Sequence, residues 1–134
     1  MSLGKWIKWD PINNLFSYYY LESTEATKAA LKFIFIEEDS GKRLAVIFDD
    51  SVVFYRITNE LLTSRRLGDP IEYEGGEQFQ KGIFFKVINS ACLKWLTEES
   101  GLDLDVQRFI HFSIVSEDDF IDVIATNEPC LEWI

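Results

Sequence analysis

The sequence contains little of what marks several large classes of protein. It has one histidine, two cysteines and three prolines in 134 residues. Cys92 and Cys130 lack metal-ligand spacing, so they signal neither a zinc site nor a disulfide framework, and a single bridge between them stays an alternative. No apolar run approaches the roughly 20 residues that span a bilayer, and no signal peptide is recognisable. We therefore expect a cytoplasmic protein without a membrane partner.

Basic residues are scarce in the second half of the chain. Residues 1–67 carry nine Lys and Arg against nine Asp and Glu, whereas residues 68–134 carry four against fourteen, which gives the net charge of −10. Nucleic-acid binding requires clustered Lys and Arg to neutralise phosphates, and anionic membrane surfaces make the same demand. The only such clusters are Lys42-Arg43 and Arg65-Arg66. Nucleic acid is therefore excluded as an expected partner.

Hydrophobic residues make up 47% of the chain and aromatic residues 15%, which is enough for the core of a single domain over residues 1–134. The dominant period is two, as where Leu31, Phe33 and Phe35 alternate with other side chains, and this period predicts strands. The expected strands are 16–22, 28–37, 43–48, 52–57, 83–88, 108–115 and 120–126, with a final extended segment through Trp133. Residues 59–82 break the pattern and predict a long loop.

One helix interrupts the strands. Asn89 or Ser90 is a suitable N-cap, and Gly101 is a suitable stop. The sequence thus predicts an α+β fold: a mostly antiparallel sheet, a meander of about six to eight strands, with one main helix near residues 90–100. Strands that are apolar on both faces, as at 52–55, need cover from the helix and from loops, a second sheet layer or a second subunit.

The residues show no catalytic signature. His111, the only histidine, lies in an apolar strand, where a packing role is the common one. Cys92 and His111 would make a nucleophile and base, but no third orienting group is evident. Arg56 and Glu60 are predicted to form a structural pair. No EF-hand spacing is present, and we expect no enzyme, no cofactor and no metal.

Carboxylates are crowded at three places in the second half: residues 72–77 in the predicted loop, residues 98–105 around the end of the predicted helix, and residues 117–119 between two predicted strands. Glu98 and Glu99 fall in the last turn of the predicted helix, where the helix dipole disfavours negative charge, and Asp103 and Asp105 follow directly. One interpretation is a hydrated acidic surface without a role. The other is that a basic partner relieves the crowding.

Four ordered stretches carry a family resemblance. They are Lys8-Trp9-Asp10-Pro11, residues 54–60, residues 85–90 running into 94–100, and residues 111–115 through 119–124 to Glu128-Pro129. Together they cover most of the chain and resemble a set of small, uncharacterised bacterial proteins, whereas residues 61–82 match least. Members of that set resemble the often acidic immunity proteins that accompany bacterial polymorphic toxins. The resemblance implies a protein that binds a cognate toxin and blocks it.

The resemblance and the charge together predict a non-catalytic protein-binding module that docks an acidic surface on a basic toxin domain. The candidate contact residues are Glu72, Glu74, Glu77, Glu98, Glu99, Asp103, Asp105, Glu117, Asp118 and Asp119. Two alternatives remain: a small-molecule-binding domain or enzyme with a pocket in the sheet, and a structural subunit that forms a homodimer.

Overall fold

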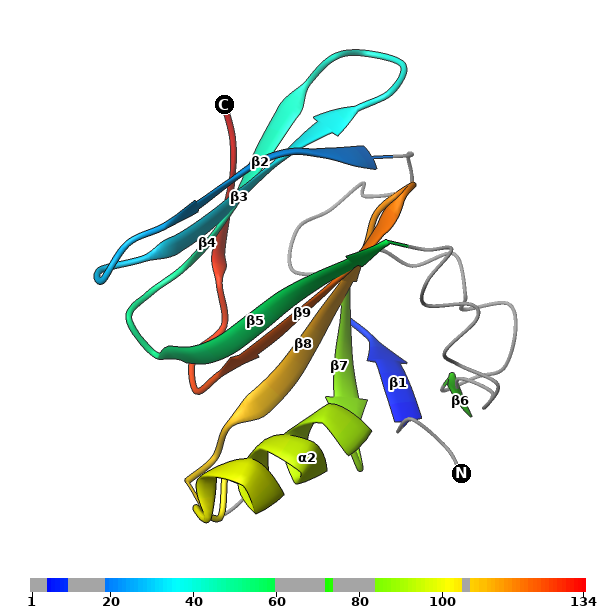
Figure 1. The fold of residues 1–134 in the computed structure, drawn as a ribbon. Coiled ribbons are helices and arrows are strands. Elements are labelled where there is room, and N and C mark those ends of the chain that lie inside the picture. Colours follow the sequence, from blue (N-terminus) through cyan, green and yellow to red (C-terminus); the bar gives the residue numbers. More distant parts are fainter. Residues whose placement is uncertain (1–4, 10–18, 60–71, 74–83, 105–106) are drawn as a thin grey trace.

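Two β-sheets face each other, and one helix lies on the outer face of the larger sheet (Figure 1). The computed structural model describes residues 5–9, 19–59, 72–73, 84–104 and 107–134. The elements are β1 (Lys5–Lys8), β2 (Tyr19–Ala26), β3 (Leu31–Glu37), β4 (Arg43–Phe48), β5 (Val52–Asn59), β6 (Glu72–Tyr73), β7 (Phe84–Ile88), α2 (Ala91–Ser100), β8 (Ile110–Val115), β9 (Asp119–Ala125) and β10 (Cys130–Trp133).

Strand order confirms the predicted α+β class with a mostly antiparallel sheet. Within the described residues the larger sheet has the order β5-β9-β8-β7-β1-β6, and the smaller has β10-β4-β3-β2. The pairing of β1 with β6 is parallel, and the other pairs are antiparallel. The expected meander holds for β2, β3 and β4. It breaks at β5, which leaves the smaller sheet and pairs with β9 instead.

Two of the chain's crossings between the sheets, from β4 to β5 and from β9 to β10, lie at neighbouring corners. The β4–β5 turn and the β9–β10 turn are joined because the Asn127 side-chain amide donates to Asp49 Oδ2 at 2.8 Å. The Asn127 backbone N–H also donates to Ser51 Oγ at 3.3 Å. The predicted strands 43–48 and 52–57 correctly left a short turn between them, but turn residues do not specify which sheet the next strand joins.

The main core fills the space between the sheets. Alternate residues of β3 and β4, among them Phe33, Phe35 and Phe48, pack against Phe112 and Ile121 of the larger sheet. Fully burying a side chain of this size contributes about 1.5–3 kcal/mol relative to leaving it exposed. The smaller sheet is thus the second layer that the two-sided apolar strands required.

Helix α2 covers part of the opposite face of the larger sheet. Its N-cap is Ser90, and Gly101 ends it in the left-handed conformation, with φ of 72° and its N–H donating to the Thr97 carbonyl. Cys92 and Leu93 are buried there with Leu104 and Ile124. The predicted helix near residues 90–100 and its stop at Gly101 are confirmed, and of the two N-cap candidates, Asn89 and Ser90, the structure selects Ser90.

Three further predictions concern the loop, the cysteines and membrane-spanning segments. Apart from β6 and the last residue of β5, the predicted loop 59–82 lies outside the described residues. Neither cysteine is in a disulfide: Cys92 is buried, and Cys130 is exposed. Within the described ranges, no helix combines the length and the apolar character needed to cross a membrane.

Candidate functional site

The predicted contact residues fall into two described groups. Glu98, Glu99 and Asp103 are exposed at the C-terminal end of α2, which has no basic residue in its last turn. We call these three residues the helix end. Three other predicted contact residues, Glu74, Glu77 and Asp105, lie outside the described residues. The backbone of Glu72 is described, but its side chain is not.

The second group is the turn between β8 and β9. Glu117, Asp118 and Asp119 meet the start of β2 there, because the Glu117 N–H donates to the Tyr19 carbonyl at 2.9 Å. Glu38, just beyond the end of β3, joins them. We call Glu38, Glu117, Asp118 and Asp119 the acidic end. Glu38 was not among the predicted contact residues because it lies in the first half of the chain, where acidic and basic residues balance.

The carboxylates of the acidic end act on the groups beside them. Partial burial, followed by the charges of Glu38 and Glu117, raises the pKa of Tyr20 above its ordinary value. Burial and then the neighbouring charge of Asp118 raise the pKa of Asp119. Burial and then Glu37 raise the pKa of Tyr19 to about 12. Segments from both sheets therefore concentrate negative charge at this end of the molecule.

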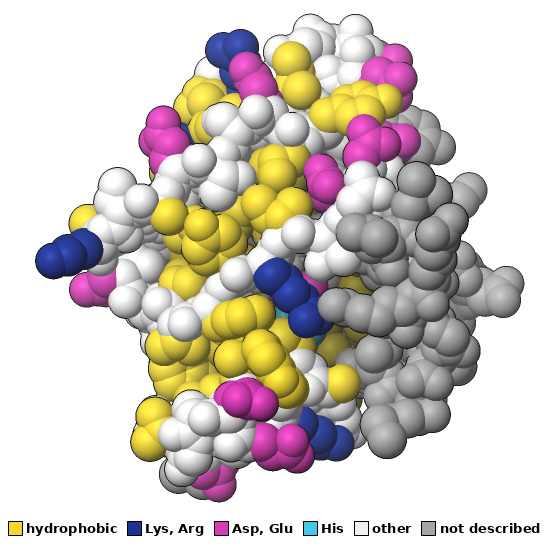
Figure 2. Space-filling model, viewed as in Figure 1, with side chains coloured by type: hydrophobic (Ala, Val, Ile, Leu, Met, Phe, Trp, Pro, Cys, Tyr) yellow, Lys and Arg dark blue, Asp and Glu magenta, His cyan; other side chains and the backbone are white. Residues whose placement is uncertain are grey.

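The structure does not bring the acidic end and the helix end together. They flank opposite ends of β8, whose six residues span about 17 Å at the usual rise per residue. Acidic side chains accordingly gather over α2 at the lower edge of the molecule and again at the upper right (Figure 2). A partner with one small basic groove would contact one group.

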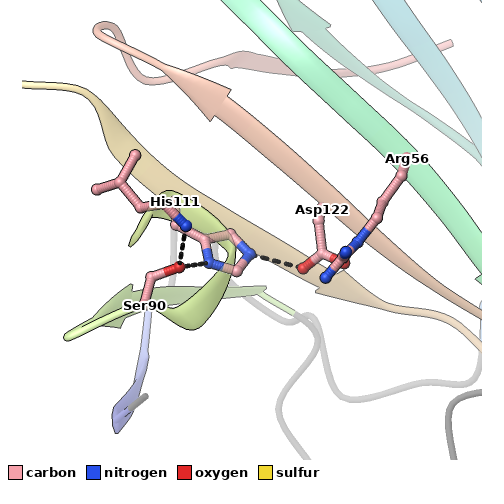
Figure 3. A network of polar contacts seen from close by, with 5 residues as sticks. Arg56, Ser90, His111 and Asp122 are labelled. Carbon is pink, nitrogen blue, oxygen red and sulfur yellow. Dashed lines mark hydrogen bonds and ion pairs between the residues drawn. The ribbon is translucent and has the colours of Figure 1, made fainter. Parts of the chain in front are cut away.

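A chain of polar contacts crosses the outer face of the larger sheet (Figure 3). His111 Nδ1 lies 2.6 Å from Ser90 Oγ, and His111 Nε2 lies 2.6 Å from Asp122 Oδ1. The other Asp122 oxygen, Oδ2, accepts from Arg56 Nε at 3.0 Å. We call these four residues the polar chain. They come from the β7–α2 junction and from β8, β9 and β5.

Alternation and register place the polar chain on one face. In the antiparallel pair of β8 and β9, Ser113 lies opposite Asp122 and His111 lies opposite Ile124, so His111 and Asp122 are diagonal neighbours. Arg56 lies directly opposite Asp122 on the other side of β9. Asn89, with φ of 52°, turns the chain so that Ser90 sits between β7 and α2.

Burial makes these contacts strong. Ser90, His111 and Asp122 are 3%, 4% and 6% exposed. Burial alone would raise the pKa of the Asp122 carboxyl, but the hydrogen bond and charge of His111, together with Arg56, outweigh it and lower that pKa. Asp122 is therefore held ionised at neutral pH, which an orienting carboxylate requires.

A pocket of about 410 Å³ adjoins the polar chain. Ser90 and His111 both line it, next to apolar side chains such as Val87, Leu93 and Phe109. Lys94, an exposed residue of the first turns of α2, also borders it. A hydroxyl, an imidazole and a cation thus meet at a largely apolar wall.

Sequence reasoning found only part of the polar chain. His111 was singled out beside Cys92, but its ring contacts Ser90 and Asp122. The predicted partner of Arg56, Glu60, lies outside the described residues, and Arg56 pairs with Asp122. The contact of His111 with Asp122 could have been predicted from the sequence. Strands β8 and β9 are joined by a short turn, and that turn sets the register that makes the two residues diagonal neighbours. In the part of the chain that the structure describes, no three His, Cys, Asp or Glu side chains gather to hold a metal ion.

Comparisons with known proteins do not assign this chain to a family. No protein-family model, no curated protein and no solved structure matches this chain. The acidic end, the helix end and the polar chain are therefore the features of this chain that bear on its function.

Proposed function

We propose that the protein is a protein-binding module of the immunity type, which neutralises a bacterial toxin in the cytoplasm. On this proposal the acidic end docks on a basic groove of the toxin domain. The observation that carries the proposal is the convergence of Glu38, Glu117 and Asp118 around Tyr20 from both sheets. The net charge of −10 supports it because a partner of opposite charge is drawn in by long-range attraction.

Aromatic side chains at the same end favour a protein partner. Tyr20 is partly exposed among the carboxylates, and Trp133 is exposed and packs with Tyr19 at a ring distance of 6.5 Å. Tyr and Trp dominate the few residues that carry most of the binding energy at interfaces. An aromatic anchor within a charged rim fits such a surface.

Charge reversal tests the proposal. The variant Glu38→Lys, Glu117→Lys, Asp118→Lys is compared with wild type for binding to the product of the neighbouring gene, at 50 and 300 mM NaCl. We expect the association rate constant at low salt to fall at least tenfold, because steering depends on the sign of the surface potential. Wild-type association should slow markedly at the higher salt concentration.

The helix end provides a matched control. The variant Glu98→Lys, Glu99→Lys, Asp103→Lys makes the same change in net charge at the opposite end of β8. We expect it to slow association less than the acidic-end variant does. Equal binding by wild type and the acidic-end variant would refute the proposed surface, and a larger loss in the control would move the contact to α2.

A further inference from the structure

The polar chain contains more contacts than Ser90 needs in order to cap helix α2. An N-cap needs only that Ser90 Oγ accept the Leu93 N–H, which it does at 3.0 Å. The contacts to His111, then to Asp122, then to Arg56 add nothing to that bond. Together they reproduce a nucleophile, a base and an orienting carboxylate.

We propose that Ser90, His111 and Asp122 form a catalytic triad that hydrolyses carboxylic esters in the pocket beside α2. The proposal goes beyond toxin binding, since the pocket lies next to α2 and the acidic end lies beyond the far end of β8. Ser90 is the nucleophile, and His111 is the general base. Asp122 is the positioning residue, held in turn by Arg56.

The hydrogen bonds assign the protons. With a neutral imidazole, Nε2–H donates to the ionised Asp122, so Nδ1 is left to accept the Ser90 O–H. One Ser90 lone pair accepts the Leu93 N–H, and a second lone pair remains for attack. The N-terminal end of α2 favours negative charge developing on Oγ.

The pocket indicates the class of substrate. Its apolar wall, which includes Val87, Leu93 and Phe109, fits a short apolar acyl group. Lys94 borders the pocket, and its ammonium is the group that would stabilise an oxyanion there. The preferred substrate is therefore a short-chain acyl ester.

The reaction balances with water as the second reactant. Ser90 Oγ bonds to the acyl carbon, and its proton passes to His111 Nδ1. The ester C–O bond then breaks, and the alkoxide leaves as an alcohol with the proton from His111. Water next attacks the acyl carbon and gives a proton to His111, the acyl–Oγ bond breaks, the carboxylic acid departs, and Ser90 regains its proton.

Covalent labelling of the wild-type chain is the direct test. A fluorophosphonate probe should add one adduct, which peptide mapping by mass spectrometry should place on Ser90. Hydrolysis of p-nitrophenyl butyrate should be measurable and should fall at least 100-fold in His111→Gln and in Asp122→Asn. Labelling elsewhere, or neither adduct nor hydrolysis while a known serine esterase reacts in parallel, would overturn the proposal.

Two variants separate chemistry from folding. Ser90→Asn keeps a side-chain oxygen that caps α2 but removes the nucleophile, whereas Ser90→Ala removes both. Both should lose hydrolysis and labelling, and circular dichroism should find Ser90→Asn folded. Ser113→Ala, which changes another buried serine on the outer face of the larger sheet, should keep both ester hydrolysis and labelling. Hydrolysis retained in folded Ser90→Asn would contradict the triad, and no outcome of these assays depends on toxin binding.

Discussion

Single residues on the outer face of the larger sheet differ in how well their polar atoms are satisfied. Ser113 is fully buried on β8, and its Oγ has no hydrogen-bond partner among the described residues. Asp122, directly opposite it on β9, has both oxygens engaged. An unmade hydrogen bond costs more than a made one contributes, so these two positions should respond to substitution in opposite directions.

Ser113→Ala should stabilise the protein. The substitution removes a buried hydroxyl without a partner and leaves an apolar methyl group, so the free energy of unfolding should rise by about 1 kcal/mol. Urea denaturation measures the change. Ser116→Ala is the matched control, because Ser116 Oγ donates to the Asp119 carbonyl and accepts the Asp119 N–H, and its loss should destabilise the protein. A lower stability for Ser113→Ala would show that its hydroxyl has a role.

Asp122 should make stability depend on pH. Its pKa is lowered in the folded state, so its contribution is present above the unfolded value near 4 and is lost as pH falls through the folded value. Urea denaturation between pH 7 and pH 2.5 should therefore show a fall in wild type that is smaller in Asp122→Asn. At pH 7 the variant should be less stable, by about 1.5–3 kcal/mol, because Arg56 and His111 lose their hydrogen bonds to a charged carboxylate. Parallel pH profiles would contradict this assignment.

Elements with strong local signals were predictable, and their partners were not. Helix α2 was predicted, with its stop at Gly101 and its N-cap narrowed to Asn89 or Ser90, because caps act within one turn of the helix. The strands followed from alternation, but alternation does not say that β5 pairs with β9. The same gap explains the site: His111 was noticed, whereas Asp122 and Arg56 join it only through the registers of β8, β9 and β5.

Gly101 provides a test at the element scale. Its φ of 72° is strained for a residue with a Cβ, although no atom lies within 4 Å of where that Cβ would be. Gly101→Ala should therefore cost about 1 kcal/mol through backbone strain alone. Gly101→Asn should cost less, since Asn tolerates this conformation. Thermal unfolding of both variants checks the order, and equal melting temperatures for the wild type and Gly101→Ala would contradict it.

Charge is a property of the whole molecule. A net charge of −10 in 134 residues opposes compaction through self-repulsion, and at the acidic end the carboxylates from both sheets lie near one another. The two sheets meet there, so repulsion acts between layers as well as within them. Conditions that weaken it should stabilise the fold.

Salt should therefore raise the urea midpoint. Screening becomes effective near 0.1 M NaCl, where the Debye length is about 10 Å. The variant Glu38→Gln, Glu117→Gln, Asp118→Asn should be more stable than wild type at 10 mM NaCl and should gain less from added salt. Glu98→Gln, Glu99→Gln, Asp103→Asn removes the same charge at the helix end, which draws carboxylates from one sequence segment only. A salt response that is unchanged in the acidic-end variant would contradict the repulsion between sheets.

The crossings from β4 to β5 and from β9 to β10 govern the order in which the molecule assembles during synthesis. Strand β5 can pair with β9 only after β9 has been synthesised, and Arg56 and Asp122 are 66 positions apart in the sequence. The edge of β4 that pairs with β10 stays open until β10 has been synthesised. Such distant pairings slow folding because the chain loses the entropy of loop closure before the stabilising contacts between the strands form. On the ribosome, the β2–β3–β4 meander is thus the part that can form early. It would carry an apolar face of Phe33, Phe35 and Phe48 with nothing yet to cover it, the kind of nascent surface that chaperones hold.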